Sequence, residues 1–428
     1  MVGSGQQTLP GSSVLSCPAC QITLPELTVT DRCPECQDLL ELKHDLHGLD
    51  PVQLKELWAL RRGAVSLPDS SGVWRFRELV MPSLSQSDRI ITYPEGNTPL
   101  LRNDSLAAWT GAGWLRLKHE GMNPTGSFKD RGMTVAVTNA ARVEARAVAC
   151  ASTGNTAASL ASYGAQAGLA TLVVLPHGGV ELGKLHQAIA YGAKILEVAG
   201  DFDRCLELLA QAARELPIYL ANSINPFRLE GQKTIVWELL DQLDWAAPDW
   251  LVVPAGNLGN TAAFGKALRE ASQLGLIDRI PKVVAVQASG AAPFVQGFQE
   301  GFTVRHKVTA QTQASAIRIG APASWNRAVR TINETSGLAI AVTDAMIIAA
   351  KAQLDRNGIG AELASATTIA GIRLLRESNI IADGDRVVAV LTGHILKDSH
   401  AVKAVKPQGN VIADEAAALN RAIEDLLD

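Results

Sequence analysis

A single lysine stands in a turn that is rich in small residues. Lys129 lies within Asn123-Pro-Thr-Gly-Ser-Phe-Lys-Asp-Arg-Gly-Met133, between Phe128 and the pair Asp130-Arg131. A lysine partly withdrawn from water has a lowered pKa, and its neutral amine can form a Schiff base with a carbonyl compound. An exposed turn lysine paired with its acidic neighbour is the alternative, which the turn alone favours.

A glycine-rich turn supplies a second candidate for chemistry. Pro254-Ala-Gly-Asn-Leu-Gly-Asn260 follows an apolar run, Trp250–Val253, and precedes a helical pattern. Its glycines let the backbone approach an anion, and the N–H groups of a helix start favour a phosphate. No G-x-G-x-x-G follows a strand, and Gly259–Ala267 departs from a Walker A motif in spacing and in its last residue.

Four of the six cysteines form two close pairs. Cys17-Pro-Ala-Cys20 and Cys33-Pro-Glu-Cys36 give a C-x2-C-x12-C-x2-C pattern. In a reducing compartment this pattern favours a tetrahedral Zn²⁺ site over disulfides or free thiols. Four thiolates leave no open coordination position, so we expect Cys17, Cys20, Cys33 and Cys36 to hold a structural zinc ion in a small ribbon.

Composition narrows the class of protein. The 428-residue chain has 39 Lys+Arg and 43 Asp+Glu, a formal net charge of −4, and 47% apolar residues. This balance is typical of an enzyme-sized globular protein of two or three domains. Residues 1–48 carry two basic and six acidic residues, the opposite of what phosphate binding requires, so we expect no nucleic-acid partner. No apolar run of about 18 residues or signal-like N-terminus occurs, so we expect no membrane partner and a cytoplasmic protein.

Strand-like and helix-like patterns alternate along most of the chain. We expect strands at Ala147–Ala151, Thr171–Leu175, Lys194–Val198, Ile218–Ala221, Trp250–Val253, Val283–Gln287 and Arg386–Leu391. We expect helices near Asp50–Leu60 and at Thr156–Ala167, Leu182–Tyr191, Phe202–Leu216, Gln232–Leu243, Thr261–Ser272 and Ala413–Leu427, with an extended connector at Ser66–Ser87. This order predicts an α/β fold whose mostly parallel sheets are covered on both faces, with ligands at the carboxyl ends of strands.

Four motifs occur in one order along the chain: Gly126-Ser-Phe-Lys-Asp-Arg-Gly132, Ser152-Thr-Gly-Asn-Thr156, Gly256-Asn-Leu-Gly-Asn260 and Leu391-Thr-Gly-His394. Over residues 95–398 the chain resembles the threonine synthases, which are fold-type-II pyridoxal-phosphate enzymes of the tryptophan synthase β family. Asn222-Ser-Ile-Asn-Pro-Phe-Arg-Leu-Glu-Gly-Gln-Lys233 resembles these enzymes more than their dehydratase relatives. The resemblance implies two open, mostly parallel twisted sheets flanked by helices, beside the small N-terminal four-cysteine ribbon.

Pattern and resemblance together divide the chain into five parts. We expect a zinc-ribbon-like module (1–48), a helical or extended connector (49–94), a smaller α/β domain (120–215), a larger PLP-binding domain (95–119 and 216–405) and a C-terminal tail helix (406–428).

The resemblance implies a role for each matching residue toward pyridoxal 5'-phosphate (PLP). Lys129 would bind the cofactor through a Schiff base and shuttle protons. Asn155 would donate to the phenolic oxygen, and Thr392 would meet the pyridine nitrogen. The phosphate would be wrapped by backbone donors of Gly256, Asn257, Leu258, Gly259 and Asn260.

The substrate residues follow from the same resemblance. Ser152, Thr153 and Thr156 lie at a helix start that suits a carboxylate. Thr156, Asn222, Ser223 and Arg228 match positions that contact the substrate phosphate, and an arginine fork suits that group. The segment Glu362-Leu-Ala-Ser365 lacks a proline found in the family, and we assign Glu362 no role.

The resemblance implies a PLP-dependent carbon–oxygen lyase, acting as a homodimer, that converts O-phospho-L-homoserine and water to L-threonine and phosphate. A cysteate synthase-like enzyme remains an alternative, because phosphoserine is shorter by only one methylene. A threonine dehydratase-like lyase is disfavoured by the Gly-Asn-Leu-Gly-Asn loop. A zinc-ribbon interaction protein with an inactive body is disfavoured because Lys129, Asn155 and Thr392 occur together.

Overall fold

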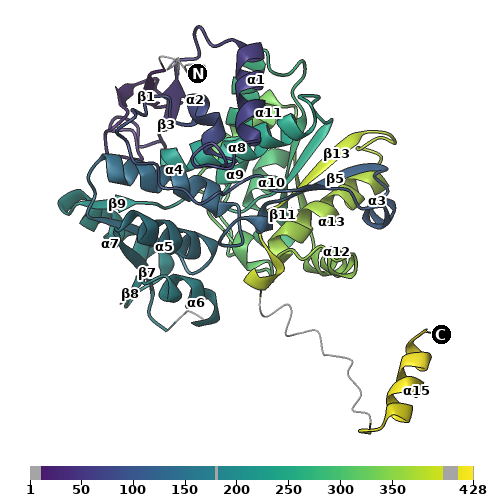
Figure 1. Cartoon of the computed structure of the whole chain (residues 1–428). Coiled ribbons are helices and arrows are strands. Elements are labelled where there is room, and N and C mark those ends of the chain that lie inside the picture. Colours follow the sequence, from purple (N-terminus) through teal and green to yellow (C-terminus); the bar gives the residue numbers. More distant parts are fainter. Residues whose placement is uncertain (1–10, 179–181, 399–412, 428) are drawn as a thin grey trace, which may run out of the picture.

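The structure, a computed structural model, describes residues 11–178, 182–398 and 413–427. Two sheets form the body, and a third, small sheet lies at the N-terminal end of the chain (Figure 1). This small sheet has the order β2-β1-β3 and is antiparallel throughout. Its strands are β1 (Ser13–Ser16), β2 (Thr23–Pro25) and β3 (Glu41–His44).

The larger sheet has six strands in the order β12-β11-β10-β13-β5-β4. All neighbours are parallel except the short edge strand β4, which runs antiparallel to β5. The strands are β4 (Leu100–Leu101), β5 (Trp114–His119), β10 (Trp250–Pro254), β11 (Lys282–Ala288), β12 (Leu338–Val342) and β13 (Arg386–Leu391).

The smaller sheet has four parallel strands in the order β8-β7-β6-β9. They are β6 (Ala147–Ala151), β7 (Ala170–Pro176), β8 (Lys194–Val198) and β9 (Ile218–Leu220). Strand β9 belongs to this sheet although it follows residue 215, where we expect the smaller domain to end. The expected fold class, two open and mostly parallel sheets flanked by helices, is confirmed.

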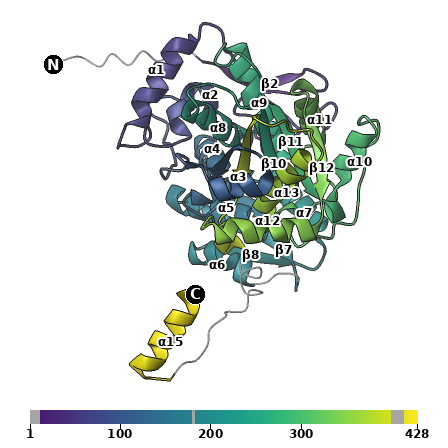
Figure 2. The same ribbon diagram turned by 90° about the vertical axis from the view of Figure 1, so that its right-hand side faces the viewer.

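Helices cover both faces of both sheets (Figures 1 and 2). The body contains α3 (Asp104–Thr110), α4 (Lys129–Arg142), α5 (Asn155–Ala167), α6 (Leu182–Ala190), α7 (Phe202–Glu215), α8 (Pro226–Gln242), α9 (Gly259–Gln273), α10 (Pro293–Gln299), α11 (Trp325–Glu334), α12 (Asp344–Arg356) and α13 (Leu363–Glu377). Five short 3-10 turns are η1 (Trp74–Phe76), η2 (Glu120–Met122), η3 (Ser289–Ala291), η4 (Ser315–Ile317) and η5 (Ile395–Lys397). Helix α15 (Ala416–Leu427) lies within the expected tail. The expected end of the larger domain, at residue 405, and the start of the tail, 406–412, lie outside the described residues.

The alternation of side chains along a central strand explains why two layers of helices are needed. In β10, Val253 packs into the core that α8 and α9 cover, and Val252 packs into the core that α12 and α13 cover. A strand buried on both faces reads as a continuous apolar run, as Trp250–Val253 does. The carboxyl ends of such strands are left uncovered, and ligands bind there.

The segment expected to be an extended connector is partly helical. Helix α1 (Pro51–Arg62) begins as predicted after the cap residue Asp50. Within 66–87, however, the chain forms η1 and the short helix α2 (Arg77–Val80). Phe76 is buried, with its ring 5.1 Å from that of Trp58 and 5.9 Å from that of Trp237. Burial of aromatic side chains against α1 and α8 outweighs the local preference of serine and proline for extended backbone.

Helices α4 and α8 pack closely at a glycine. A Cβ atom on Gly231 of α8 would lie 1.7 Å from the carbonyl oxygen of Arg131 in α4. Only glycine permits this approach of two backbones. The contact brings α8 against the helix whose first residue is Lys129.

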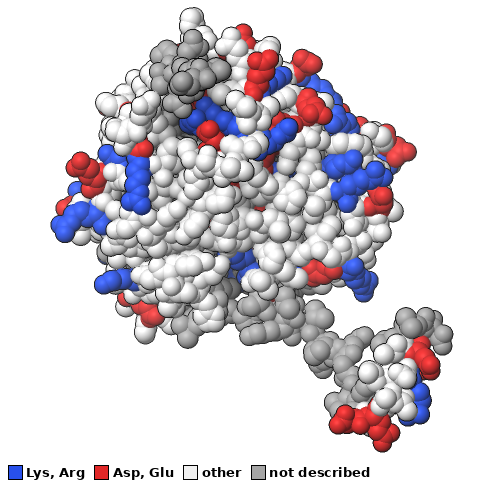
Figure 3. Space-filling view, in the orientation of Figure 1, with Lys and Arg blue, Asp and Glu red and all other residues white. Residues whose placement is uncertain are grey.

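Charged side chains of both signs are interspersed on the face shown in Figure 3. Within the described residues, no helix is both long and apolar enough to cross a membrane.

Candidate active site

A cavity of about 1150 Å³ opens at the carboxyl ends of strands from both sheets. Ala151 at the end of β6, Pro254 at the end of β10 and Thr392 just after β13 line it. Every residue that we expect to contact cofactor or substrate lines the same cavity, except Arg228. Segments more than 200 residues apart in sequence therefore meet at one place, as the fold predicts.

Lys129 is the first residue of α4 and lies beside Thr392. The Phe128 amide donates to the carbonyl oxygen of Thr392 at 3.0 Å, and Ser127 forms a β-bridge with Gly393. The Lys129 amine lies over the Phe128 ring, 4.1 Å from its centroid. Burial, reinforced by the nearby Arg228 guanidinium, lowers the pKa of Lys129 to about 7. A large fraction of the amine is therefore neutral and nucleophilic near neutral pH.

Glu362, to which the sequence assigns no role, lies at the centre of the cavity-lining residues. Its carboxylate accepts a hydrogen bond from the Asn155 amide at 3.0 Å and from the Thr392 hydroxyl at 3.1 Å. Burial raises the pKa of Glu362 to about 7, although Asn155, Thr392 and Lys129 oppose the rise. Glu362 thus joins two predicted residues, Asn155 and Thr392, that come from distant parts of the chain.

The loop 256–260 has the form of an anion cradle. Leu258 has a left-handed backbone (φ 65°) and makes no side-chain cap for α9, which starts at Gly259. The Thr261 amide donates to the Asn260 side chain at 2.9 Å, whereas the amides of Gly259 and Asn260 have no side-chain acceptor among the described residues. A Cβ atom on Gly256 would lie 2.9 Å from the Cα atom of Ile317, so a side chain there would force the loop apart. Uncapped N–H groups at a helix start that face a cavity fit the phosphate of PLP.

A second uncapped helix start faces the same cavity. Helix α5 begins at Asn155, its cap residue is Gly154, and no described side chain caps it. Ser152, Thr153 and Thr156 line the cavity around this start. The arrangement suits a carboxylate, because the helix dipole and free N–H groups favour negative charge.

The residues predicted to meet the substrate phosphate are divided between the cavity wall and the layer behind it. The Asn222 amide group pairs with the backbone of Ala151, at 3.2 and 3.0 Å. Ser223 accepts a hydrogen bond from the Asn257 side chain. Arg228 is fully buried behind the wall and donates from Nη1 to the carbonyl oxygen of Ala221 at 3.1 Å. Its Nε and Nη2 atoms have no hydrogen-bond partner among the described residues.

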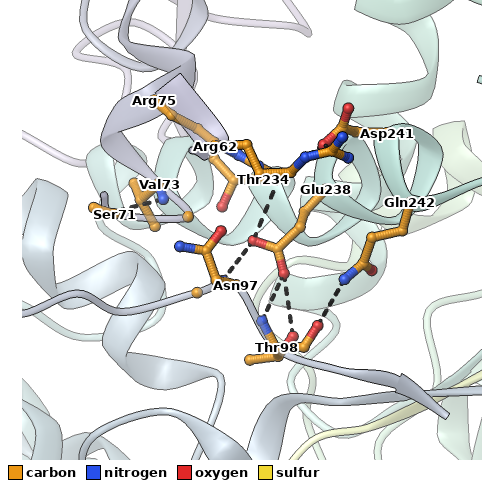
Figure 4. Close-up of polar contacts among 12 residues, drawn as sticks. Arg62, Ser71, Val73, Arg75, Asn97, Thr98, Thr234, Glu238, Asp241 and Gln242 are labelled. Carbon is orange, nitrogen blue, oxygen red and sulfur yellow. Dashed lines mark hydrogen bonds and ion pairs between the residues drawn. The ribbon is translucent and has the colours of Figure 1, made fainter. Parts of the chain in front are cut away.

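A cluster of buried charges holds α4 against α8. Figure 4 shows Glu238 of α8 pointing toward the amides of Asn97 and Thr98, with hydrogen bonds of 2.7 and 2.9 Å. The Glu238 carboxylate also pairs with Arg131 at 2.8 Å and with Lys118 at 2.5 Å. Burial alone would raise the pKa of Glu238, but these two cations hold it well below its usual range. Arg131 lies two residues after Lys129, so this cluster fixes the first turn of α4, which carries the lysine.

Other residues of the cavity are not among those predicted from the sequence. Lys397 of η5 donates to Gln187 of α6, and both line the cavity. The loop 315–319 lines it as well. A lysine soon after Leu391-Thr-Gly-His394 is a usable signal for Lys397, whereas nothing local in the sequence distinguishes Gln187.

The four paired cysteines lie together in the small N-terminal sheet. Their sulfur atoms lie within 4.8 Å of one another, with Sγ distances of 3.4 Å for Cys17–Cys36 and for Cys20–Cys33. Each pair closes a similar turn, because the amide four residues after the first cysteine donates to its carbonyl oxygen. The predicted cluster of four sulfur atoms is confirmed.

Comparisons with known proteins agree with this geometry. Residues 91–393 match the family described as "Pyridoxal-phosphate dependent enzyme". The chain is 42% identical to a threonine synthase of Methanosarcina acetivorans, over 96% of this chain and 98% of that protein. It is 44% identical to a threonine synthase of Methanocaldococcus jannaschii, over 92% and 95%.

Among solved structures, threonine synthase from Escherichia coli aligns over 92% of this chain and 94% of its own, with a TM-score of 0.67 and 18% identity. Threonine deaminase isoform 2 from Solanum lycopersicum aligns over 73% and 84%, with a TM-score of 0.62 and 22% identity. At these identities the two structures support the fold alone. On the family match and the curated relatives, the chain belongs to the threonine synthase family of pyridoxal-phosphate-dependent enzymes.

Proposed function

We propose that this chain converts O-phospho-L-homoserine and water to L-threonine and inorganic phosphate. The observation that carries the proposal is the meeting, in one cavity, of a lysine of lowered pKa with two uncapped helix starts. The cofactor carries a phosphate and the substrate carries a carboxylate. Two anion-binding helix starts beside one reactive amine match that requirement.

PLP fits the residues that line the cavity. We propose that Lys129 binds the cofactor covalently and that backbone groups of 256–260 hold its phosphate. Asn155 and Thr392 then contact the ring. Both side chains are already oriented by Glu362. When bound, PLP stabilises negative charge on the carbon next to the substrate amino group.

Lys129 and Glu362 are the two groups that we propose for proton transfer. Both have a pKa of about 7 and therefore exchange protons readily near neutral pH. With cofactor and substrate bound, the Nζ atom of Lys129 would accept and return protons at adjacent carbons of the substrate. Glu362 holds a proton close by and limits the build-up of charge in the buried site.

We propose that the substrate carboxylate binds at the start of α5, at Ser152, Thr153 and Thr156. The phosphate of the substrate binds near Asn222 and Ser223, with Arg228 supplying positive charge from behind. The two unpartnered nitrogen atoms of Arg228 support this proposal, because a buried guanidinium without an acceptor is costly.

A product assay tests the proposed function. Purified protein with PLP and O-phosphohomoserine should release phosphate and threonine in equal amounts. Release of phosphate with a keto acid would instead indicate a dehydratase-like lyase, and turnover of phosphoserine with sulfite would indicate a cysteate synthase-like enzyme. A protein that binds no PLP and turns over none of these substrates would be the inactive-body alternative.

We propose further that Cys17, Cys20, Cys33 and Cys36 hold a structural zinc ion. Tetrahedral zinc–sulfur bonds of about 2.3 Å imply sulfur atoms about 3.8 Å apart, and three pairs here lie 3.4, 3.4 and 3.7 Å apart. Metal analysis should find one zinc per chain in wild type and a large loss in Cys17→Ser. The matched control is Cys150→Ser, a buried cysteine outside the cluster, which should retain zinc.

We also propose that the protein is a cytoplasmic homodimer. Thiolate zinc ligands persist in a reducing compartment, which supports the first part. The second part rests on the family resemblance. Light scattering should give twice the chain mass of 45.4 kDa, and a value of one chain mass would contradict it.

A further inference from the structure

The small cysteine sheet is anchored to the body by a buried arginine. Arg327 of α11 is only 6% exposed and donates from Nη2 to the carbonyl oxygen of Leu40. Its Nε and Nη1 atoms have no hydrogen-bond partner in the described part of the chain. Leu40 lies four residues after Cys36, and its amide donates to the carbonyl oxygen of Asp31 within the cysteine segment. One hydrogen bond therefore connects the Arg327 guanidinium to the cysteine module.

The start of the same helix contacts the loop that we propose for the cofactor phosphate. The Ala323 amide donates to the Asn257 side-chain oxygen at 2.6 Å. The Ser324 amide donates to the Asn257 carbonyl oxygen at 3.2 Å. Arg327 lies only three residues after Ser324, in the first turn of α11. Because one helical turn moves as a unit, a displacement of Arg327 displaces the donors that hold Asn257.

A second anchor ends on the helix that starts at this loop. Lys266 of α9 donates to the carbonyl oxygen of Leu42 at 2.5 Å and pairs with Glu230 of α8. His44 of β3 contacts Glu230 at 2.7 Å. The nearby Lys233 ammonium also pairs with Glu230, so two lysines balance the buried acidic groups and we infer no metal ion there. Residues 40–44 thus contact α8, α9 and α11 together.

The charge of the cysteine module matches this docking. Two of the six acidic residues in 1–48 contact α11. Glu41 pairs with Arg330 at 3.0 Å, and Asp38 accepts from the Asn326 side chain at 3.1 Å. Both contacts lie nearer the surface than the bond from Arg327. Acidic residues of the cysteine module, whose charge disfavours a nucleic-acid partner, are thus used in contacts with α11 of the same chain.

We propose that Arg327 is a positioning residue for the cofactor loop, through which the cysteine module sets the affinity for PLP. The inference rests on the proposed cofactor site. In this arrangement the module does not contact the cofactor or the substrate. It holds the first turn of α11, and that turn holds Asn257 in the cradle.

The experiment compares PLP binding by three variants with that of wild type. Apoprotein is titrated with PLP and followed by the visible absorption of the bound cofactor. Arg327→Met removes the donor to Leu40 and should weaken PLP binding about tenfold. Arg327→Lys should restore most of the affinity, because a single donor suffices where only Nη2 has a partner. Turnover at saturating PLP should change less than affinity.

Arg330→Met is the matched control. It lies on the same helix and contacts the same module, but three residues beyond Arg327 and outside the turn that contacts Asn257. Its PLP affinity should equal that of wild type within the error of the titration, even where the melting temperatures of the two methionine variants fall alike. Wild-type affinity in Arg327→Met, or equal weakening in Arg330→Met, would overturn the inference.

A surface variant keeps the inference testable if Arg327→Met does not fold. Asn326→Ala removes only the contact with Asp38 and should weaken PLP binding about twofold; unchanged binding would overturn the inference. A wild-type protein that binds no PLP would instead overturn the proposed function, so the two failures are distinguishable.

Discussion

Two of the places at which the chain buries charged side chains differ in how those charges are compensated. Around Glu238, the cations Arg131 and Lys118 meet the carboxylate directly. In the cavity, Lys129 is half-buried and Glu362 is buried, yet no ion pair of the described residues joins them. The pKa of Glu238 lies well below its usual range, whereas Lys129 and Glu362 both have a pKa of about 7.

The difference separates a scaffold from a reactive site. A buried carboxylate surrounded by cations and amides keeps its charge at every pH at which the protein functions. An amine and a carboxyl group without a paired opposite charge have pKa values near neutrality, so each can both accept and release a proton at neutral pH. The two places are joined through α4, because Lys129 and Arg131 are only two residues apart. The ion pair of Arg131 with Glu238 therefore holds in place the helix turn that carries Lys129.

The largest effect is expected from removing the reactive amine. Lys129→Ala should reduce turnover by about 10³-fold or more, because the covalent and proton-transfer roles are lost together. The matched control is Lys118→Met, which removes a buried lysine from the scaffold and should lower stability while covalent PLP binding persists. Borohydride reduction followed by mass spectrometry tests both. PLP label on a residue other than 129 would contradict the assignment.

The next effect is on stability. Glu238→Gln should destabilise the protein by about 3–5 kcal/mol, since it leaves Lys118 buried without a paired carboxylate and Arg131 with Glu120 alone. Glu362→Gln should change the free energy of unfolding far less at pH 8, because the amide replaces a carboxylate that burial already disfavours. Urea unfolding of both variants measures the contrast. Equal losses would mean that the two carboxylates are compensated alike.

The local motifs of the site could be predicted from the sequence, but the roles of the two carboxylates, Glu362 and Glu238, could not. The motif around Lys129, the loop 256–260 and the positions of the seven expected strands follow from local patterns, since each is a short segment with its own backbone requirement. The order of the strands within each sheet does not follow from them. Glu362 could not be assigned, because its role arises from Asn155 and Thr392, some 207 and 30 residues away. The same holds for Glu238, whose partners come from four segments. Burial of aromatic residues likewise overrode the expected extended connector at 66–87.

The pH dependence of PLP binding by the apoprotein tests the lowered pKa of Lys129. A free lysine reacts with an aldehyde as the neutral amine, so the rate at which apoprotein takes up PLP should rise about tenfold per pH unit below the pKa of Lys129. With that pKa at about 7, the rate should level off above pH 7. Stopped-flow absorbance between pH 5.5 and 9 measures it. A rate still rising tenfold per unit at pH 9 would show that Lys129 has an ordinary pKa.

A third buried carboxyl tests whether neutral donors can replace cations. Glu95 is fully buried and accepts hydrogen bonds from Ser71, Thr92 and Tyr163. Burial nevertheless raises its pKa to about 7, so hydrogen bonds from hydroxyl groups do not keep it charged as Arg131 and Lys118 keep Glu238.

Because the pKa of Glu95 is higher in the folded than in the unfolded chain, its protonation stabilises the fold fully below about pH 4.5, and this contribution is lost as pH rises through 7. Glu95→Gln lacks this dependence. The stability of wild type relative to Glu95→Gln should therefore fall by roughly 1–2 kcal/mol between pH 5 and pH 7, as measured by urea unfolding. A difference that grows in favour of wild type would mean that the three hydroxyl groups compensate the charge after all.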